Sequence, residues 1–400
     1  MMTEFFSLPL HVSCDMLGSW LDLKSVVSLD SAVCNHSARG QLVHFLSSKG
    51  LVHQNPVHLR GVKMLHWLFL RSFRVADVHF NVETVHSSLL IRYFASFGDA
   101  LRGVHFFDQC NNAEIMYLIA CFCKNITVLR CINVSIPWAF NALLLNNPNI
   151  KEIWVRSTTC KLDDMMANLS LHKLQLLSVK DMDCPVGFPW SESTHSTSLQ
   201  RVEFVELDSY VDDMKAMMQN CPKLRSFSCQ KIQIEDDNMT SYLSSNPEII
   251  NLDISNNSVV TDKAILFIAQ NLHGLRTLNI QHCAKLTILS LQYIAEYCTM
   301  LDVLYLDIRG ANKATEQVVN MLSTRCNSLA YLNINSDFIL CTTTCSYSLI
   351  KGCPALHTLV INKYEYITPT TRGFCAVVRP QLNILVHDTS TEYNVLTMPV

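Results

Sequence analysis

The sequence predicts an α/β solenoid of about 12–13 short repeats, preceded by an all-helical N-terminal module. Three observations predict it. A six-residue apolar pattern, L-x-x-L-x-L, recurs along most of the 400 residues; apolar residues between its copies have helical spacing; and the first residues do not fit the period. Hydrophobic residues make up 49% of the chain and charged residues only 16%, so we expect much of its length to be buried.

The copies of the pattern follow one another at nearly constant spacing. They start at Val75, Leu101, Ile126, Ile150, Leu174, Leu199, Leu224, Ile249, Leu275, Leu301, Leu329, Leu356 and Leu382. Successive starts differ by 24–28 residues. This period is typical of leucine-rich repeats, in which each unit is one short strand and one helix. Residues 75–400 are therefore expected to form a leucine-rich repeat horseshoe.

Within a unit, the strand and the helix can be read separately. In "LRTLNI" (275–280), Leu278 and Ile280 should point to one side of a strand, and Thr277 and Asn279 to the other. The stretch "TDKAILFIAQNL" (261–272) has helical spacing, with Thr261 as its expected N-cap. One such unit cannot bury its apolar face alone, so stacked neighbours are expected to share a continuous core.

Cysteines recur at two positions of the repeat. In the unit 275–298, which resembles the cysteine-containing leucine-rich repeat subfamily, Cys283 follows the strand and Cys298 ends the helix. The second position is also occupied by Cys221, Cys326 and Cys353, and by Asn-Pro at 147–148 and 246–247. We expect these cysteines to be small buried hydrophobic residues at the joints between repeats. With no secretory signal evident, the 17 cysteines suggest reduced thiols and an intracellular location, cytoplasmic or nuclear.

The N-terminal module, residues 1–48, begins with "LPLHVSCDMLGSWLDLKSVVSLDSAVC" from Leu8. This stretch resembles an F-box, a helical module with a Leu-Pro start and a Val-Cys ending. The matching positions are Leu8, Pro9, Val12, Met16, Leu17, Leu21, Leu29, Val33 and Cys34. Ser37 stands where the family usually has Trp. Residues 49–74 would be a helical transition into the repeats.

The resemblance implies a partner and a role. F-box proteins with leucine-rich repeats are substrate receptors of cullin-RING ubiquitin ligases: the F-box docks on a small adaptor subunit and the repeats hold the substrate. The matched positions, Met16 and Leu29 aside, would then face the adaptor or form the core of the module. An alternative is a helical cap on a plain repeat scaffold, or a fixed subunit of a larger assembly, with no ubiquitin role.

The concave strand face is where a solenoid is expected to bind its partner. The strand positions that alternate with the core carry Arg130, Trp154, Arg156, Lys180, Arg201, Tyr305 and Tyr331. Arg, Trp and Tyr often anchor protein interfaces. Arg also pairs with carboxylates and phosphates, so an acidic or phosphorylated segment of a protein partner would suit this face.

Other classes of function find no support in the sequence. No phosphate-binding loop, metalloprotease, serine-hydrolase or EF-hand pattern is present, and neither a metal nor a cofactor is expected. The net charge of −3 gives no reason to expect nucleic acid, and no apolar run is long enough to cross a membrane. Cys34 and His36 in "SAVCNHSARG" suggest a thiol hydrolase, but residues two apart on a helix project about 200° apart and cannot pair. We expect a non-enzymatic protein, monomeric outside its complex.

Overall fold

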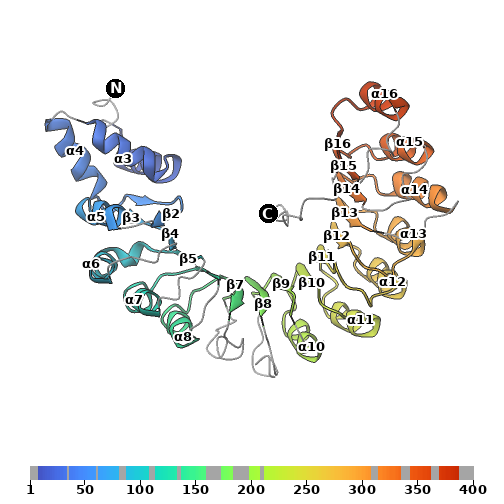
Figure 1. Cartoon of the computed structure of the whole chain (residues 1–400), viewed down its shortest axis with the longest axis horizontal. Helices are drawn as coiled ribbons and strands as arrows, with labels where there is room; N and C mark the ends of the chain where they lie inside the picture. Colours follow the sequence, from blue (N-terminus) through green and yellow to red (C-terminus); the bar gives the residue numbers. More distant parts are fainter. Residues whose placement is uncertain are drawn as a thin grey trace. The chain divides into compact units, whose positions relative to one another are not determined.

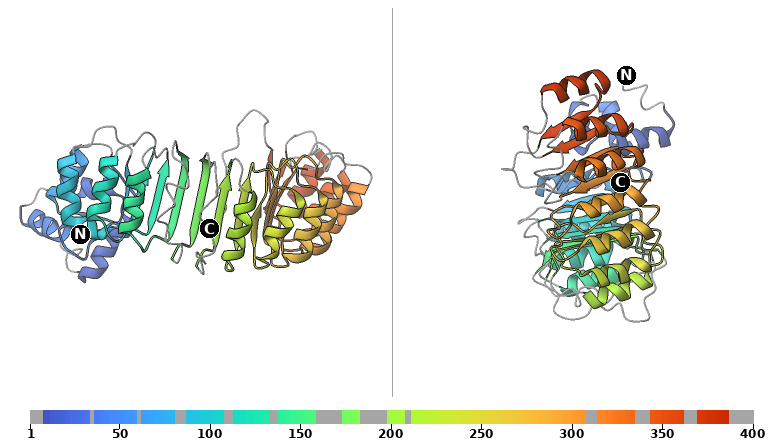
Figure 2. Two further views of the ribbon diagram at one scale, coloured as in Figure 1. Left: turned by 90° about the horizontal axis from the view of Figure 1, so that it is seen from below. Right: turned by 90° about the vertical axis from the view of Figure 1, so that its right-hand side faces the viewer.

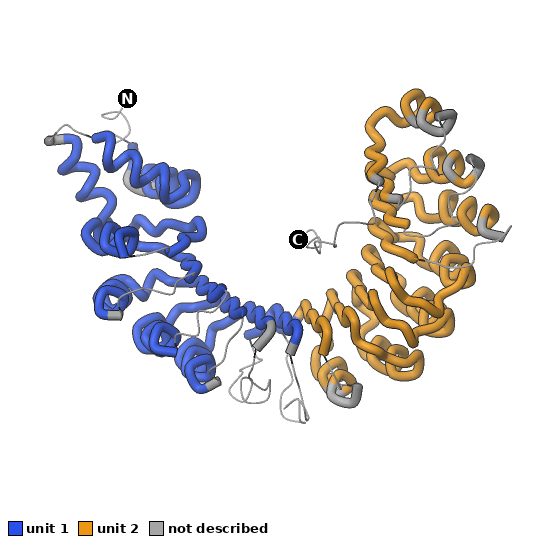
Figure 3. The backbone as a smooth tube through the Cα atoms, in the orientation of Figure 1, with its two compact units in different colours: residues 1–199 blue, residues 200–400 orange. Residues whose placement is uncertain are grey.

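A computed structural model describes twelve stretches of the chain. They are residues 8–33, 36–59, 62–80, 87–107, 113–132, 137–158, 173–182, 198–207, 211–307, 314–334, 343–361 and 369–386. The chain divides into two compact units, residues 1–199 and 200–400, which we call unit 1 and unit 2 (Figure 3). This division falls inside the repeat array rather than at the ends of the predicted N-terminal module or transition.

Unit 1 begins with a group of helices. These are α2 (Leu10–Asp15), the π-helical turn η1 (Met16–Trp20), α3 (Leu23–Ala32) and α4 (His36–Leu46). Asp22 caps α3 by accepting a hydrogen bond from the Ser25 amide at 2.8 Å. Leu17, Val26 and Leu42 are fully buried, which gives the module a small apolar core of its own.

A buried carboxylate connects this module to the next helix, α5 (Val62–Leu70). Asp30 accepts hydrogen bonds from Trp67 Nε1 at 3.0 Å and from Arg71 Nε at 3.1 Å. Arg39, on α4, donates to the main-chain carbonyl of Asp30 at 2.7 Å and to that of Val33 at 3.1 Å. Three helices are therefore held around one residue of α3.

The segment 49–74, expected to be helical, also contains strands. β1 (Val52–His53) pairs in parallel with β3 (Arg74–Val75), and β2 (Val57–Leu59) joins the main sheet beside β4. Among the described residues of this segment, α5 is the only helix. The sequence pattern missed β2 because "VHL" is too short to show the L-x-x-L-x-L spacing.

The main sheet of unit 1 is parallel, in the order β2-β4-β5-β6-β7-β8. After β2, its strands are β4 (Asp77–Phe80), β5 (Gly103–Phe106), β6 (Val128–Ile132), β7 (Glu152–Thr158) and β8 (Leu176–Met182). α6 (Ser87–Phe97), followed by the short 3-10 turn η2 (Gly98–Ala100), α7 (Ala113–Phe122) and α8 (Pro137–Asn146) pack side by side along one face of this sheet (Figure 1).

Unit 2 repeats the same arrangement with few interruptions. Its parallel strands are β9 (Arg201–Val205), β10 (Ser226–Gln230), β11 (Asn251–Asp253), β12 (Thr277–Ile280), β13 (Val303–Leu306), β14 (Tyr331–Ile334), β15 (Thr358–Ile361) and β16 (Asn383–Val386). Its helices are α10 (Val211–Asn220), α11 (Asp236–Ser244), α12 (Asp262–Asn271), α13 (Ile288–Tyr297), α14 (Ala314–Arg325), α15 (Thr343–Gly352) and α16 (Pro369–Val378). They form one layer beside the strands (Figure 2). No helix in the described part of the chain is long and apolar enough to span a bilayer.

The register of the strands follows the predicted repeat, with one error. Leu278 and Ile280 are buried against the helices, while Thr277 and Asn279 are on the opposite face, as predicted. Thr261 caps α12 by accepting from the Lys263 amide, also as predicted. The copy placed at Leu382 is wrong by one residue, because Thr358 pairs with Asn383. That unit starts at residue 381, and Leu385 is consequently 53% exposed instead of buried.

The residues at the joints between repeats are buried, and several of them also form hydrogen bonds. Cys326 Sγ donates to the carbonyl of Cys298, one repeat earlier, at 3.5 Å. Asn246 Nδ2 donates to the Met218 carbonyl of the preceding repeat at 2.8 Å, and Asn147 Oδ1 accepts from the Ile126 amide of its own repeat at 3.0 Å. Cys and Asn are thus interchangeable there because each is small and each can hydrogen-bond to the backbone of the preceding repeat.

Candidate functional site

The predicted adaptor-facing residues divide into exposed and buried groups. Leu8, Pro9 and Val12 are exposed, and Leu21 is half-buried. Leu17 and Val33 are buried, at 1% and 5% exposure, so they stabilise the module and cannot contact a partner. Cys34, and the side chains of His36 and Ser37, lie outside the described residues.

Trp20 is an exposed aromatic residue that the sequence analysis did not select. Its side chain is 71% exposed at the end of η1, the most exposed of the large apolar side chains described in this module. Asn55 holds the backbone beside it by donating to the carbonyls of Ser19, at 3.2 Å, and Leu21, at 3.0 Å. Trp20 lies between two polar residues, Ser19 and the Asp22 cap, in "GSWLD", and that sequence context would have indicated exposure.

In unit 1, the face of the sheet opposite the helices, here called the open face, carries a row of aromatic and basic side chains. We call it the central row: His58, His79, His105, Arg130 and Trp154, one from each strand in register. The His79 and His105 rings stack at 4.1 Å between centroids, and His58 meets His79 edge-on at 4.6 Å. The Arg130 guanidinium lies 4.9 Å from the Trp154 ring centre, within the range of a cation–π interaction.

Beyond the central row, some of the basic residues predicted for the concave strand face form ion pairs with acidic side chains. Arg156 donates to Asp181 at 2.9 Å, one strand away. Arg156 and Lys180 pair in register on β7 and β8. In unit 2, Arg201 forms an ion pair with Glu203 on its own strand. The open face of unit 1 is therefore a mixed surface of aromatic, basic and acidic side chains, rather than an anion-binding one.

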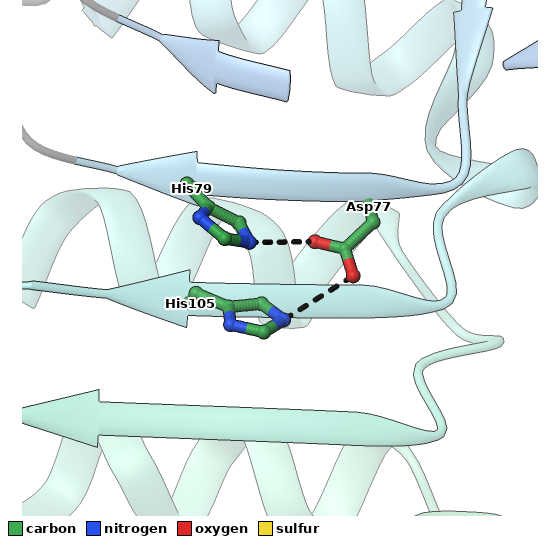
Figure 4. Close-up of side chains that lie close together, drawn as sticks. All are labelled: Asp77, His79 and His105. Carbon is green, nitrogen blue, oxygen red and sulfur yellow. Dashed lines mark ion pairs between the residues drawn. The ribbon is translucent and has the colours of Figure 1, made fainter. Parts of the chain in front are cut away.

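Two neighbouring members of the central row, His79 and His105, form a cluster of three titratable side chains with Asp77 (Figure 4). Asp77 Oδ1 lies 3.4 Å from His79 Nε2, and its Oδ2 lies 3.2 Å from His105 Nε2. With one ligand atom taken from each residue, the three atoms lie within 4.8 Å of one another. Burial, together with the neighbouring His105, lowers the pKa of His79 to about 4, so its ring is neutral at pH 7.

The open face of unit 2 has a different character. Asp253 is buried and accepts from Gln230 at 2.8 Å, Asn279 at 3.0 Å and the Ser255 amide at 3.0 Å. Burial raises the pKa of Asp253, and these hydrogen bonds act in the opposite direction.

The two predicted tyrosines of unit 2 do come together. The Tyr305 and Tyr331 rings lie 5.1 Å apart on neighbouring strands. Burial, then Tyr331, raises the pKa of Tyr305 to about 12. Arg201 is not part of this pair, because β10, β11 and β12 lie between its strand and β13.

One comparison with a solved structure supports the fold. A chain in the crystal structure of the Rad7 and Elc1 complex in yeast is similar to this one with a TM-score of 0.61 and 13% sequence identity, over 94% of this chain and 91% of that chain. The leucine-rich repeat-containing protein LegL7 from Legionella pneumophila has a TM-score of 0.39 and 10% identity, over 82% of this chain and 98% of its own. No protein-family model and no curated protein sequence matches the chain. The chain has the α/β leucine-rich repeat fold predicted from its sequence.

Proposed function

We propose that this protein is a non-catalytic receptor subunit of a cullin-RING ubiquitin ligase. Its N-terminal helices would dock on the ligase's small adaptor, and the open face of the repeats would hold the substrate. One observation carries the proposal: the N-terminal helical module, directly before a leucine-rich repeat array, has several exposed apolar side chains. Leu8, Val12 and Trp20 are all exposed there.

The residues of the module suit an adaptor interface. Exposed Leu, Val and Trp side chains are costly to leave in water, and Trp in particular concentrates binding energy when a partner covers it. The similar chain from the Rad7 and Elc1 structure was crystallised in a complex, which supports a role in protein assembly for a chain of this fold.

The substrate would bind the open face of unit 1. Trp154 and Arg130 offer an aromatic surface with a cation held over it, and Arg156 is already paired with Asp181. A segment with both aromatic and polar side chains fits such a surface better than a purely acidic one. This refines the acidic or phosphorylated segment expected from sequence.

A pull-down tests adaptor docking. The intact chain should recover the adaptor and a cullin from cells, and the double substitution Val12→Asp with Trp20→Asp should abolish recovery. Leu145→Asp is a matched control, because Leu145 is a 64% exposed apolar side chain on α8, outside the module. Circular dichroism checks that each variant is folded.

The same pull-down distinguishes the ligase receptor from the alternative, a repeat scaffold with no ubiquitin role. If the intact chain recovers neither adaptor nor cullin, the ligase proposal is wrong and a scaffold without a ubiquitin role remains. If both Val12→Asp/Trp20→Asp and Leu145→Asp retain the adaptor, docking occurs elsewhere on the chain.

A further inference from the structure

We propose that Asp77, His79 and His105 bind a divalent first-row transition-metal cation, with zinc as the best-suited ion. The site includes the second and third members of the central row and lies on β4 and β5 (Figure 4). It is independent of the adaptor and substrate proposals above. Three steps of reasoning lead to it: the spacing of the ligand atoms, the room made for the carboxylate, and the unsatisfied polar atoms.

The spacing between the carboxylate and each imidazole is close to that in a tetrahedral metal site. Zinc binds imidazole nitrogen and carboxylate oxygen at about 2.0–2.2 Å, so two ligand atoms on a tetrahedron lie about 3.3 Å apart. Asp77 Oδ1 lies 3.4 Å from His79 Nε2 and Asp77 Oδ2 lies 3.2 Å from His105 Nε2, and one ligand atom from each of the three residues lies within 4.8 Å of the other two. Two imidazoles and one carboxylate also form a ligand set that zinc uses with its fourth position open.

A glycine makes room for the carboxylate. Gly103 pairs with Asp77 across β4 and β5, and a Cβ at Gly103 would lie 2.5 Å from Asp77 Oδ2. Any side chain there would displace the carboxylate from its place between the two strands. The absence of a side chain at residue 103 is therefore what lets Asp77 reach His105 on the neighbouring strand.

The cluster leaves an unusual number of buried polar atoms without hydrogen bonds. Among the described residues, both ring nitrogens of His79, both of His105 and Oδ1 of Asp77 are buried and lack a hydrogen-bond partner. His105 is only 4% exposed. Each buried polar group left without a partner destabilises the fold, because it has lost its hydrogen bonds to water. A cation bonded to the two Nε2 atoms and a carboxylate oxygen would satisfy three of these groups at once.

The repeat itself positions the ligands. His79 and His105 are 26 residues apart and occupy the same strand position in successive units, so they pair in register. A cation between them would cross-link β4 and β5 and leave its fourth position toward the open face, where water or a side chain of a bound protein would complete the shell.

Calorimetry and metal analysis of the chelator-stripped full chain test the proposal with zinc chloride as the probe. The expected result is one zinc per chain. Asp77→Asn, His79→Ala and His105→Ala should each weaken binding more than about 100-fold, the upper end of what outer-shell substitutions cost. Gly103→Ala should also weaken binding while both imidazoles remain. His273→Ala, which removes an exposed histidine of unit 2, should leave affinity unchanged.

Cobalt distinguishes this site from binding by cysteines. Co²⁺ held by imidazole and carboxylate should show visible d–d bands without the near-ultraviolet charge transfer of a thiolate ligand. Circular dichroism confirms that each variant is folded, and Asp77→Asn, which preserves volume at a part-exposed position, is the least disruptive. No zinc bound, affinity unchanged in Asp77→Asn and His79→Ala, or a thiolate–cobalt signal at full occupancy would each overturn the proposal.

Discussion

Replacing Asp30 with Ala should loosen the N-terminal helices without disturbing unit 2. The Asp30 side chain is only 3% exposed, and it accepts hydrogen bonds from Trp67 and Arg71 and pairs with Arg39 at 3.5 Å. Removing one partner of a buried ion pair costs about 3–5 kcal/mol, because the other charge is left unpaired.

The loss of stability expected for Asp30→Ala lies at the lower end of that range. The guanidinium groups of Arg71 and Arg39 are 22% and 39% exposed, so water will partly replace the carboxylate. Ala is also the better helix former within α3, by up to about 0.7 kcal/mol. We therefore expect Asp30→Ala to lower the free energy of unfolding of these helices by about 3 kcal/mol. Asp30→Asn should have an effect between those of the wild type and Asp30→Ala, since its amide oxygen can still accept from Trp67.

Hydrogen exchange followed by mass spectrometry is the appropriate assay, because it reports each segment separately. A loss of 3 kcal/mol corresponds to a drop of about 150-fold in the protection of amides in α3, α4 and α5. Helices α11–α14 of unit 2 should keep their protection. Asp237→Ala is the control, since Asp237 pairs with Lys263 at the surface and should change nothing measurable. Unchanged protection in α3–α5, or an equal loss in unit 2, would refute the reasoning.

Three further predictions concern packing, pH and thiol reactivity. Gly18→Ala should destabilise the N-terminal module by about 1–3 kcal/mol in chemical denaturation, because its Cβ would lie 2.7 Å from the Val52 carbonyl oxygen, whereas Gly40→Ala, with open space around it, should be neutral or stabilising. The raised pKa of Asp253 means that its contribution to stability is full below its unfolded pKa of about 3.8 and is lost as the pH rises through the folded value. The free energy of unfolding of Asp253→Asn relative to the wild type should therefore increase with pH above about 4; a difference independent of pH would contradict this. Iodoacetamide at neutral pH should label the exposed Cys121 in the native protein and spare Cys326, since burial raises the pKa of Cys326 to about 12; peptide mass spectrometry would show the opposite order if the joint cysteines were accessible.

The architecture was predictable because a repeat imposes the same constraint many times. An error in one unit leaves the period of the other units unchanged. The copy placed at Leu382 is wrong by one residue, yet the predicted fold is still correct. The strand β2 was not predictable in the same way, since three residues are too few for the alternation of buried and exposed side chains to register. The role of Asp30 was also not predictable, because its partners Trp67 and Arg71 lie 37 and 41 residues away and outside the repeat, so no spacing in the sequence relates them.

The site residues were harder to predict, because a solenoid brings together side chains that are close in repeat position and distant in sequence. Considered one at a time, His79 and His105 look like isolated histidines, and the sequence analysis grouped neither of them with Arg130 and Trp154. Aligned by repeat position, these four residues belong to one row, and the structure places them on consecutive strands. The same alignment places Gly103 opposite Asp77, but it does not show that the Asp77 carboxylate fills the space this glycine leaves and lies beside His105. A close approach of this kind depends on which position of the neighbouring strand is a glycine. It can therefore be recognised only when adjacent repeat units are compared position by position. For a protein built from repeats, candidate sites should therefore be sought along the rows of the sheet and at the glycines beside them, before they are sought in local motifs.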